Sequence, residues 1–103
     1  MLPRALRTIG ERTFAGCKQL RSLDFGSDSV LEEIRPKAFL DSGLETFVAP
    51  PSLRKVGQMA FCRCTQLKYF QLNEGIREPG WLCLLGTNGP VLKLPTHVRK
   101  TPE

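Results

Sequence analysis

Two cysteines one residue apart, Cys62 and Cys64, are the first candidates for chemistry in this sequence of 103 residues. Thiolates bind zinc, but a structural zinc site takes four ligands, usually in C-x2-4-C pairs or together with histidines. The only histidine, His97, lies far along the chain. The string LRKVGQMAFCRCTQL, from Leu53, also occurs earlier as LRTIGERTFAGCKQL, from Leu6, with only one cysteine. The pattern therefore indicates a structural repeat, and we expect no metal and no cofactor.

Motifs that carry catalysis are equally absent from the sequence. It has no phosphate-binding glycine loop, no H-E-x-x-H and no G-x-S-x-G. Asp24 and Glu45 would come close on neighbouring strands, but two carboxylates on an open face lack the enclosed pocket that acid–base catalysis uses. We expect that the chain is not an enzyme.

The chain aligns with itself in four copies and the start of a fifth, which is the observation that decides the architecture. The copies cover approximately residues 2–25, 26–49, 50–72 and 73–94, and a partial fifth covers 95–103. We expect a single domain over residues 1–103 that is a fragment of a longer array. Six columns of apolar residues stay in register: Leu6, Leu31, Leu53, Ile76 and Val98; Ile9, Ile34 and Val56; Phe14, Phe39, Phe61 and Leu84; Leu20, Leu44 and Leu67; Leu23, Phe47, Phe70 and Leu92; Phe25, Ala49, Leu72 and Leu94.

Each copy contains an L-x-x-L-x-L pattern, in which only the last three positions alternate as a strand does. A repeat of this length with one such strand is typical of a leucine-rich repeat. The intervening segments, such as IGERTFAGC, are too short for a stable isolated helix, so each is interpreted as a turn or short helix. The predicted fold is a repeat solenoid, a leucine-rich repeat of about four coils with short parallel β-strands and turn or short-helix connections. Stacking would bury the apolar side that one repeat cannot bury alone.

The pattern I-G-x-x-A-F-x-x-C-x-x-L-x-x-L-x-L resembles the BspA-like leucine-rich repeats of surface antigens in oral bacteria and parasitic protists. The resemblance covers roughly residues 2–98 and is strong over AFLDSGLETFVAPPSLRKVGQMAFCRC. In the fourth copy Pro79, Leu84 and Gly89 replace the Ile, the Phe and the strand Leu, as terminal repeats commonly depart from the pattern. The resemblance implies a curved solenoid for protein binding, often in adhesion to host matrix or cells, a cell-surface location and no catalytic residues.

The repeat register gives the cysteines packing roles. Cys17, Ser42 and Cys64 share one position, so Cys17 and Cys64 lie two coils apart. At a strand spacing of ~4.8 Å that is roughly 10 Å, beyond the ~7 Å Cα limit for a disulfide. Cys83 falls in a column of small residues, where a buried thiol acts as a small apolar group. Cys62 is expected to point outward, and it is the candidate for a reactive thiol.

Strand alternation predicts the binding surface. Side chains between the inward leucines point outward, and in a curved solenoid this strand face is the usual ligand surface. Tyr69, the only tyrosine, lies in the middle of the ladder, and tyrosine and arginine are favoured interface anchors. The outward side chains are Arg21, Ser22, Asp24, Glu45, Thr46, Val48, Lys68, Tyr69, Gln71, Val91 and Lys93. Of these we predict that Arg21, Asp24, Glu45, Val48, Lys68, Tyr69 and Gln71 form the protein-binding site, with Val48 beside Tyr69 as a small apolar spot.

A net charge of +5 raises nucleic acid or anionic glycan as an alternative partner. A phosphate-tracking site would cluster its basic residues with aromatics, whereas here they recur about once per coil, as RPK, LRKV and HVRK. We expect a protein partner, which the resemblance identifies as a host surface or matrix protein, and no nucleic acid. The basic edge that would serve a polyanion instead contains Arg54, Lys55, Arg99 and Lys100.

Two further roles stay open at this point, a structural spacer within a longer array and a segment that associates end to end. No apolar stretch approaches the ~20 residues of a membrane helix, and no signal-peptide core is visible. The sequence by itself leaves the compartment undetermined.

Overall fold

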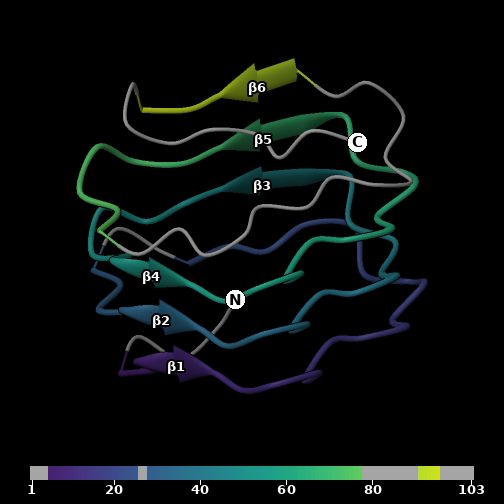
Figure 1. Cartoon of the computed structure of the whole chain (residues 1–103), viewed down its shortest axis with the longest axis horizontal. Coiled ribbons are helices and arrows are strands. Elements are labelled where there is room, and N and C mark those ends of the chain that lie inside the picture. The colour runs from purple at the N-terminus through teal and green to yellow at the C-terminus, as the bar shows by residue number, and fades with distance from the viewer. Residues whose placement is uncertain (1–4, 26–27, 78–90, 96–103) are drawn as a thin grey trace.

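The structure, a computed structural model, describes residues 5–25, 28–77 and 91–95. These residues form two three-stranded parallel sheets, which lie on two sides of a stack of chain turns (Figure 1). Sheet A has the order β1-β2-β4, and sheet B has the order β3-β5-β6. The strands are β1 (Thr8–Ile9), β2 (Glu33–Ile34), β3 (Thr46–Val48), β4 (Lys55–Val56), β5 (Tyr69–Gln71) and β6 (Val91–Lys93).

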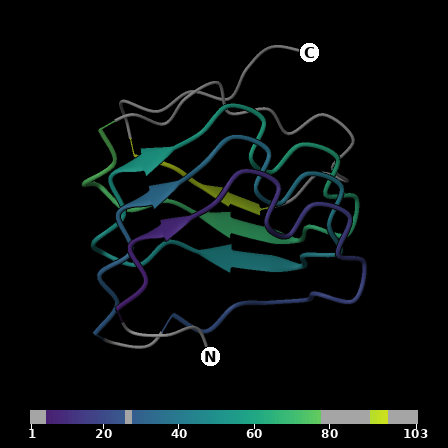
Figure 2. The ribbon, with the colours of Figure 1, turned by 90° about the horizontal axis from the view of Figure 1, so that it is seen from below.

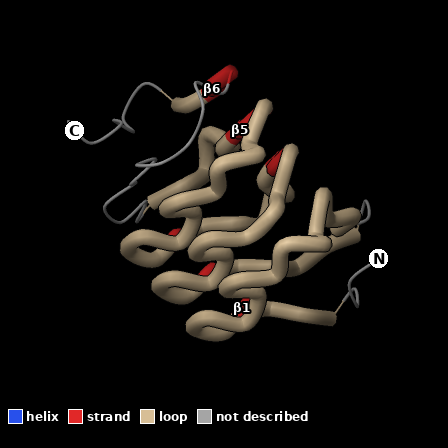
Figure 3. The backbone as a smooth tube through the Cα atoms, turned by 90° about the vertical axis from the view of Figure 1, so that its right-hand side faces the viewer, coloured by secondary structure: helices blue, strands red, loops and turns tan. Residues whose placement is uncertain are grey.

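The chain passes along one sheet and returns along the other. Figure 2 shows that the strands of sheet A point in the opposite direction to those of sheet B. Figure 3 shows the successive turns stacked on one another, with loop backbone between the short strands. Parallel pairing of successive repeats agrees with the predicted leucine-rich repeat with short parallel strands, while the number of coils and the repeat boundaries stay predictions.

Sheet A forms where an inward β-branched residue recurs once in each of the first three repeats. Ile9 pairs with Ile34 and Ile34 with Val56, and all three are buried. A branched side chain packs well on a pleated, half-buried surface. The neighbouring position faces outward and is occupied by Thr8, Glu33 and Lys55.

Sheet B is the ladder that the L-x-x-L-x-L pattern predicts. Phe47 of β3 lies opposite Phe70 of β5, and Phe70 lies opposite Leu92 of β6, as the predicted column requires. The first copy differs from the prediction, because residues 21–25 form no strand. The carbonyl oxygen of Arg21 accepts hydrogen bonds from the backbone N–H groups of Glu45 and Thr46, and residues 22–25 then continue outside the ladder.

The expectation of a single strand per repeat was incomplete, since the second and third repeats each contain two strands, one in each sheet. The sheet A strands are only two residues long. Two residues cannot show a period of two, so hydrophobic alternation has no signal for such a strand. The recurrent apolar column of Ile9 was recognised as core, but its extended conformation was not.

The sequence predicts either a turn or a short helix in each connection between the two sheets. In the described residues these connections contain turns and no helix. Each turn that leads from a sheet A strand toward sheet B contains two residues in the left-handed backbone region. The first left-handed position holds Arg12, Lys37 and Met59, with φ of 60°, 62° and 61°. The second holds Gly16, Asp41 and Arg63, with φ of 72°, 59° and 64°.

Successive turns are joined by backbone hydrogen bonds of their own. The N–H of Phe14 donates to the oxygen of Ala38 at 2.8 Å, and the N–H of Phe39 donates to the oxygen of Ala60 at 2.8 Å. The stack is thus held by backbone pairing along the turns as well as in both sheets. Such pairing satisfies peptide groups that would be costly to bury alone.

Phenylalanine rings fill the space between the sheets. Phe39 stacks between Phe14 and Phe61, with centroid distances of 5.3 and 5.1 Å and interplanar angles of 10° and 6°. A second stack joins Phe47 to Phe70 at 5.5 Å, and Phe47 touches Phe61 at 4.7 Å. Aromatic pairs at these distances contribute beyond their area burial. The predicted columns are therefore the core, and the Leu84 and Val98 positions lie outside the described residues.

Candidate protein-binding face

The outward side chains of sheet B form two rows that cross its three strands. In the first row Thr46, Tyr69 and Val91 lie opposite one another. In the second row Val48, Gln71 and Lys93 do so. We call these six side chains the sheet B face. They are exposed or half-buried, while the residues between the rows are buried or half-buried.

Tyr69 is at the centre of this face and its side chain is held in place. Its hydroxyl donates a hydrogen bond to Oε1 of Gln71 at 2.6 Å, so the ring lies along its own strand. Val91, which is 57% exposed, lies opposite Tyr69 on β6. Val48, which is 49% exposed, lies opposite Gln71 on the neighbouring strand and is therefore diagonal to Tyr69. The predicted apolar spot is thus wider than expected and includes Val91.

A charged margin precedes the face where the strands of sheet B begin. The Nη1 atom of Arg21 lies 3.5 Å from Oε2 of Glu45, which makes an ion pair between neighbouring repeats. The backbone places Lys68 next in the same column, because its N–H donates to the oxygen of Glu45 at 2.7 Å. Lys68 is exposed, and within the described part of the chain it forms no ion pair.

The structure brings together most of the predicted site residues. Arg21, Glu45 and Lys68 form the margin, and Val48, Tyr69 and Gln71 lie on the face. Asp24 is exposed, but it belongs to the first copy, where residues 21–25 form no strand. The predicted list left out Thr46, Val91 and Lys93, although period-two alternation already placed them outward.

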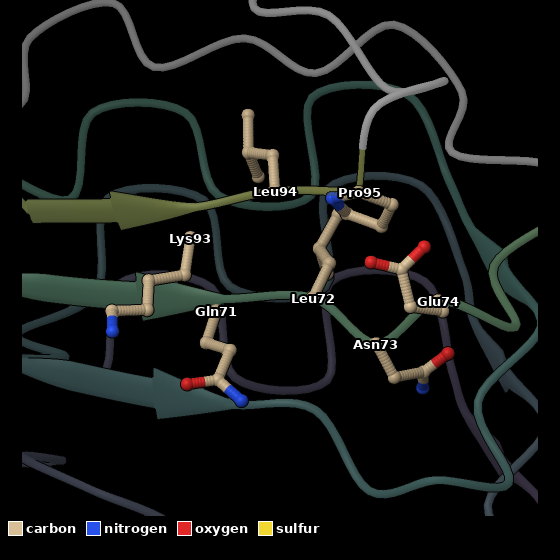
Figure 4. A pocket seen from close by; sticks show the side chains of 7 residues that line it. All are labelled: Gln71, Leu72, Asn73, Glu74, Lys93, Leu94 and Pro95. Atoms are coloured by element: carbon tan, nitrogen blue, oxygen red, sulfur yellow. The ribbon is translucent and has the colours of Figure 1, made fainter.

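A shallow hollow adjoins the end of the face after β5 and β6. Gln71 and Lys93 line it on the side of the strands, and Glu74 and Pro95 line it on the other side (Figure 4). Asn73 fixes the backbone here, because its Nδ2 donates to the oxygen of Pro50 at 2.7 Å and its Oδ1 accepts from Gly75 N at 2.6 Å. The hollow is therefore built on a hydrogen-bonded corner and extends the second row of the face.

The basic edge that would suit a polyanion is partly engaged with the protein itself. Nη1 of Arg54 donates to the carbonyl oxygens of Pro51 and Leu53. Nζ of Lys55 lies 3.8 Å from Oε2 of Glu33. The remaining members, Arg99 and Lys100, lie outside the described residues.

The thiols correct one expectation. Cys62 is buried, at 2% exposure, and not outward. Cys64 is buried as well; its Sγ donates to the oxygen of Phe39 at 3.2 Å and lies 3.5 Å from Oγ of Ser42. Burial raises the pKa of the Cys64 thiol, so the reactive thiolate is disfavoured. Cys17 is half-buried, and Cys83 lies outside the described residues.

Within the described ranges, no three His, Cys, Asp or Glu side chains lie close enough together to hold a metal ion. Those ranges also contain no helix with the length and apolarity that a membrane crossing requires.

Comparison with models of known protein families identifies the repeat. The model of a BspA type leucine-rich repeat region, in six copies, matches residues 1–103. Neither the curated proteins nor the solved structures include a match to the chain.

Proposed function

Because this chain belongs to the BspA-type leucine-rich repeat family, we propose that the sheet B face and its charged margin bind a protein partner in an adhesion-type contact at a cell surface. Leucine-rich repeats are, in general, binding modules without catalytic activity. The proposed partner is a host surface or matrix protein, the class that the family resemblance implies.

The observation that carries this proposal is the arrangement around Tyr69. A partly exposed aromatic ring lies between two exposed apolar side chains, Val48 and Val91. Interface hot spots are enriched in tyrosine and are surrounded by contacts that exclude water. The hydrogen bond to Gln71 at 2.6 Å already orients the ring. Binding therefore needs less side-chain ordering than it would for a free tyrosine.

The backbone supports the same surface. The face is made by three strands whose inward residues are core aromatic and aliphatic side chains, so the outward rows are carried on a rigid ladder. Sites on regular elements are held more precisely than sites on loops. The charged margin adds both signs of charge, through Arg21, Glu45 and Lys68, which suits a protein surface better than a polyanion.

The test pairs binding with stability for Tyr69→Ala. Purified host extracellular-matrix proteins are passed over the immobilised chain, and the affinity of any that bind is compared between the original protein and the variant. Removal of an interface anchor should weaken binding by about 2 kcal/mol or more. Because the side chain is partly exposed, the free energy of unfolding should change by only about 0.5–1 kcal/mol. Thermal unfolding measures the second quantity.

Tyr69→Phe and Arg77→Glu serve as controls. The first keeps the ring and loses only the hydrogen bond to Gln71, so it should retain most of the affinity. The second changes an exposed charge beside sheet A, where the N–H of Arg77 donates to the oxygen of Arg54. Equal affinity of Tyr69→Ala and the original protein would refute the proposal.

Two alternative functions, binding of a polyanion and end-to-end association, can be tested with the same purified proteins. Loss of binding on neutralising Arg54, Lys55, Arg99 and Lys100, together with binding to heparin that falls with salt, would move the site to the basic edge. A mass in light scattering that rises with concentration would instead support end-to-end association of an array segment.

A further inference from the structure

The cations on sheet B differ in whether the described residues neutralise them. Arg21 faces Glu45 at 3.5 Å. Lys68 and Lys93 form no ion pair with any residue that the structure describes, and both are exposed. Within the described part of the chain, the two lysines at β5 and β6 therefore lack an ion-pair partner.

These two lysines bracket the apolar part of the face. Lys68 comes directly before Tyr69, and its carbonyl oxygen accepts a hydrogen bond from the N–H of Val91 at 2.9 Å. Lys93 ends β6, lies opposite Gln71 and lines the hollow in Figure 4. Tyr69 and Val91, which lie opposite each other, thus have a lysine position on either side along the strand direction.

We propose that this part of the face recognises an acidic segment of the partner protein, in which an apolar side chain is flanked by carboxylates. The apolar side chain would cover Tyr69 and Val91, and the carboxylates would pair with Lys68 and Lys93. The inference rests on the proposed function and specifies the chemistry of its partner. Complementary charge at such a rim contributes mainly to orientation and association rate, while the apolar contact supplies most of the affinity.

Sheet A gives the internal reason for choosing an acidic partner. There the outward cations Arg35 and Lys55 lie 3.2 and 3.8 Å from Glu33, so this chain itself supplies the carboxylate. On sheet B the row positions across from Lys93 hold Gln71 and Val48. The carboxylate that neighbours Lys68 in the margin, Glu45, is already paired with Arg21 at 3.5 Å. A nucleic acid or glycan polyanion fits less well, because the two lysines are separated by an aromatic and an aliphatic side chain instead of forming a continuous basic track.

The experiment uses a display library of random twelve-residue peptides, selected on the immobilised full chain. Selected peptides are then synthesised with a fluorophore and titrated by anisotropy. We expect enrichment of peptides that contain Asp or Glu next to Leu, Val, Phe or Tyr. The double variant Lys68→Glu/Lys93→Glu should weaken their binding at least about tenfold. Repeated selection on that variant should enrich basic peptides.

The matched control is Lys37→Glu/Arg77→Glu, which changes the net charge equally at two positions outside the sheet B face. It should alter peptide affinity by less than about twofold. Raising the salt from about 0.05 to 0.5 M should weaken the original complex, because salt screens its charge pairs. The residual binding of the double variant should instead become stronger, because salt screens the repulsion between its new carboxylates and the acidic peptide.

The outcomes separate this inference from the proposed function. Selected peptides that lack acidic residues, yet lose binding in Tyr69→Ala, would overturn the acidic-segment inference and leave the face as the binding site. Peptides that bind Tyr69→Ala and Lys68→Glu/Lys93→Glu as well as the original protein would overturn both. A selection that enriches nothing would overturn the inference that a short linear segment suffices.

Discussion

Both parallel sheets contribute apolar side chains to the core, but their outward side chains differ in how their charges are paired. On sheet A, Glu33 lies within 3.2 Å of Arg35 and 3.8 Å of Lys55, and Glu32 in the preceding column lies 3.1 Å from Arg7. Charge on that side is largely satisfied inside the chain. On sheet B the centre is occupied by Val48, Tyr69 and Val91, and the next charges along the ladder are Lys68 and Lys93.

The difference indicates which side is built for stability and which for contact. Paired surface charges contribute little to binding a new partner, because the pairs must be broken first. Exposed apolar side chains beside an oriented tyrosine lose no existing interaction when a partner covers them. A stack that needs only its inward columns to fold is free to vary its outward positions, and here sheet B carries the variation that suits recognition.

The largest effect is expected from Phe39→Ala, which tests whether the two sheets share one core. The Phe39 ring is fully buried and stacks on two other rings. Its centroid lies 6.2 Å from that of Phe47 in sheet B. Its loss should leave a cavity and cost about 3–5 kcal/mol of unfolding free energy. Denaturant titration measures the loss, and hydrogen exchange should show both sheets losing protection together.

Phe14→Ala is the matched control for that prediction. The Phe14 ring is half-buried and stacks on Phe39 alone, so the loss should be clearly smaller. If Phe39→Ala removed hydrogen-exchange protection from sheet B and left sheet A protected, the two sheets would unfold as separate units and would not share one core. A loss under about 1 kcal/mol would mean that this aromatic column is not core.

The apolar columns and sheet B could be predicted because stacking repeats one environment at each position. In a parallel ladder Phe47 meets Phe70 and Phe70 meets Leu92, so one sequence position must satisfy the same burial several times over. Strands of three residues are long enough to show alternation. The outward set, including Tyr69, followed directly from that period.

The orientation of Cys62 and the side-chain contacts on sheet B could not be predicted from the sequence, because neither follows the period-two alternation of a strand. The outward position expected for Cys62 is wrong because its segment is a turn, bounded by left-handed Met59 and Arg63. A turn with two left-handed residues directs its side chains by backbone dihedrals and not by a period of two. The ion pair of Arg21 with Glu45 and the bond of Tyr69 to Gln71 depend on side-chain rotamers, which the sequence does not specify.

A smaller effect is expected from Glu33→Gln, which sharpens the contrast between the sheets. The Glu33 side chain is 24% exposed and faces two cations that are about half exposed. Loss of its charge should lower the free energy of unfolding by about 0.5–1 kcal/mol, with the exposed partners keeping the value low. Partner or peptide affinity should not change. A loss of affinity comparable to that of Tyr69→Ala would show that sheet A also contacts the partner.

The smallest effect is expected on the turn edge between the sheets, where Nζ of Lys18 lies 2.6 Å from Oδ1 of Asp41. The hydrogen bond from Lys18, aided by its charge, lowers the pKa of Asp41 below its ordinary value. A carboxyl group with a lowered folded-state pKa stabilises the fold above its unfolded pKa, and the contribution disappears as the pH falls through the folded value. Both side chains are more than half exposed, so screening by water keeps the effect small. The melting temperature of Lys18→Gln should therefore lie slightly below that of the original protein at about pH 7, and the two should converge at about pH 2. Added salt at neutral pH should narrow the gap as well. A gap that persisted in acid would mean that Lys18 stabilises the turn through the packing of its aliphatic stem, and the turn edge would then resemble the apolar core more than the ion-paired surface of sheet A.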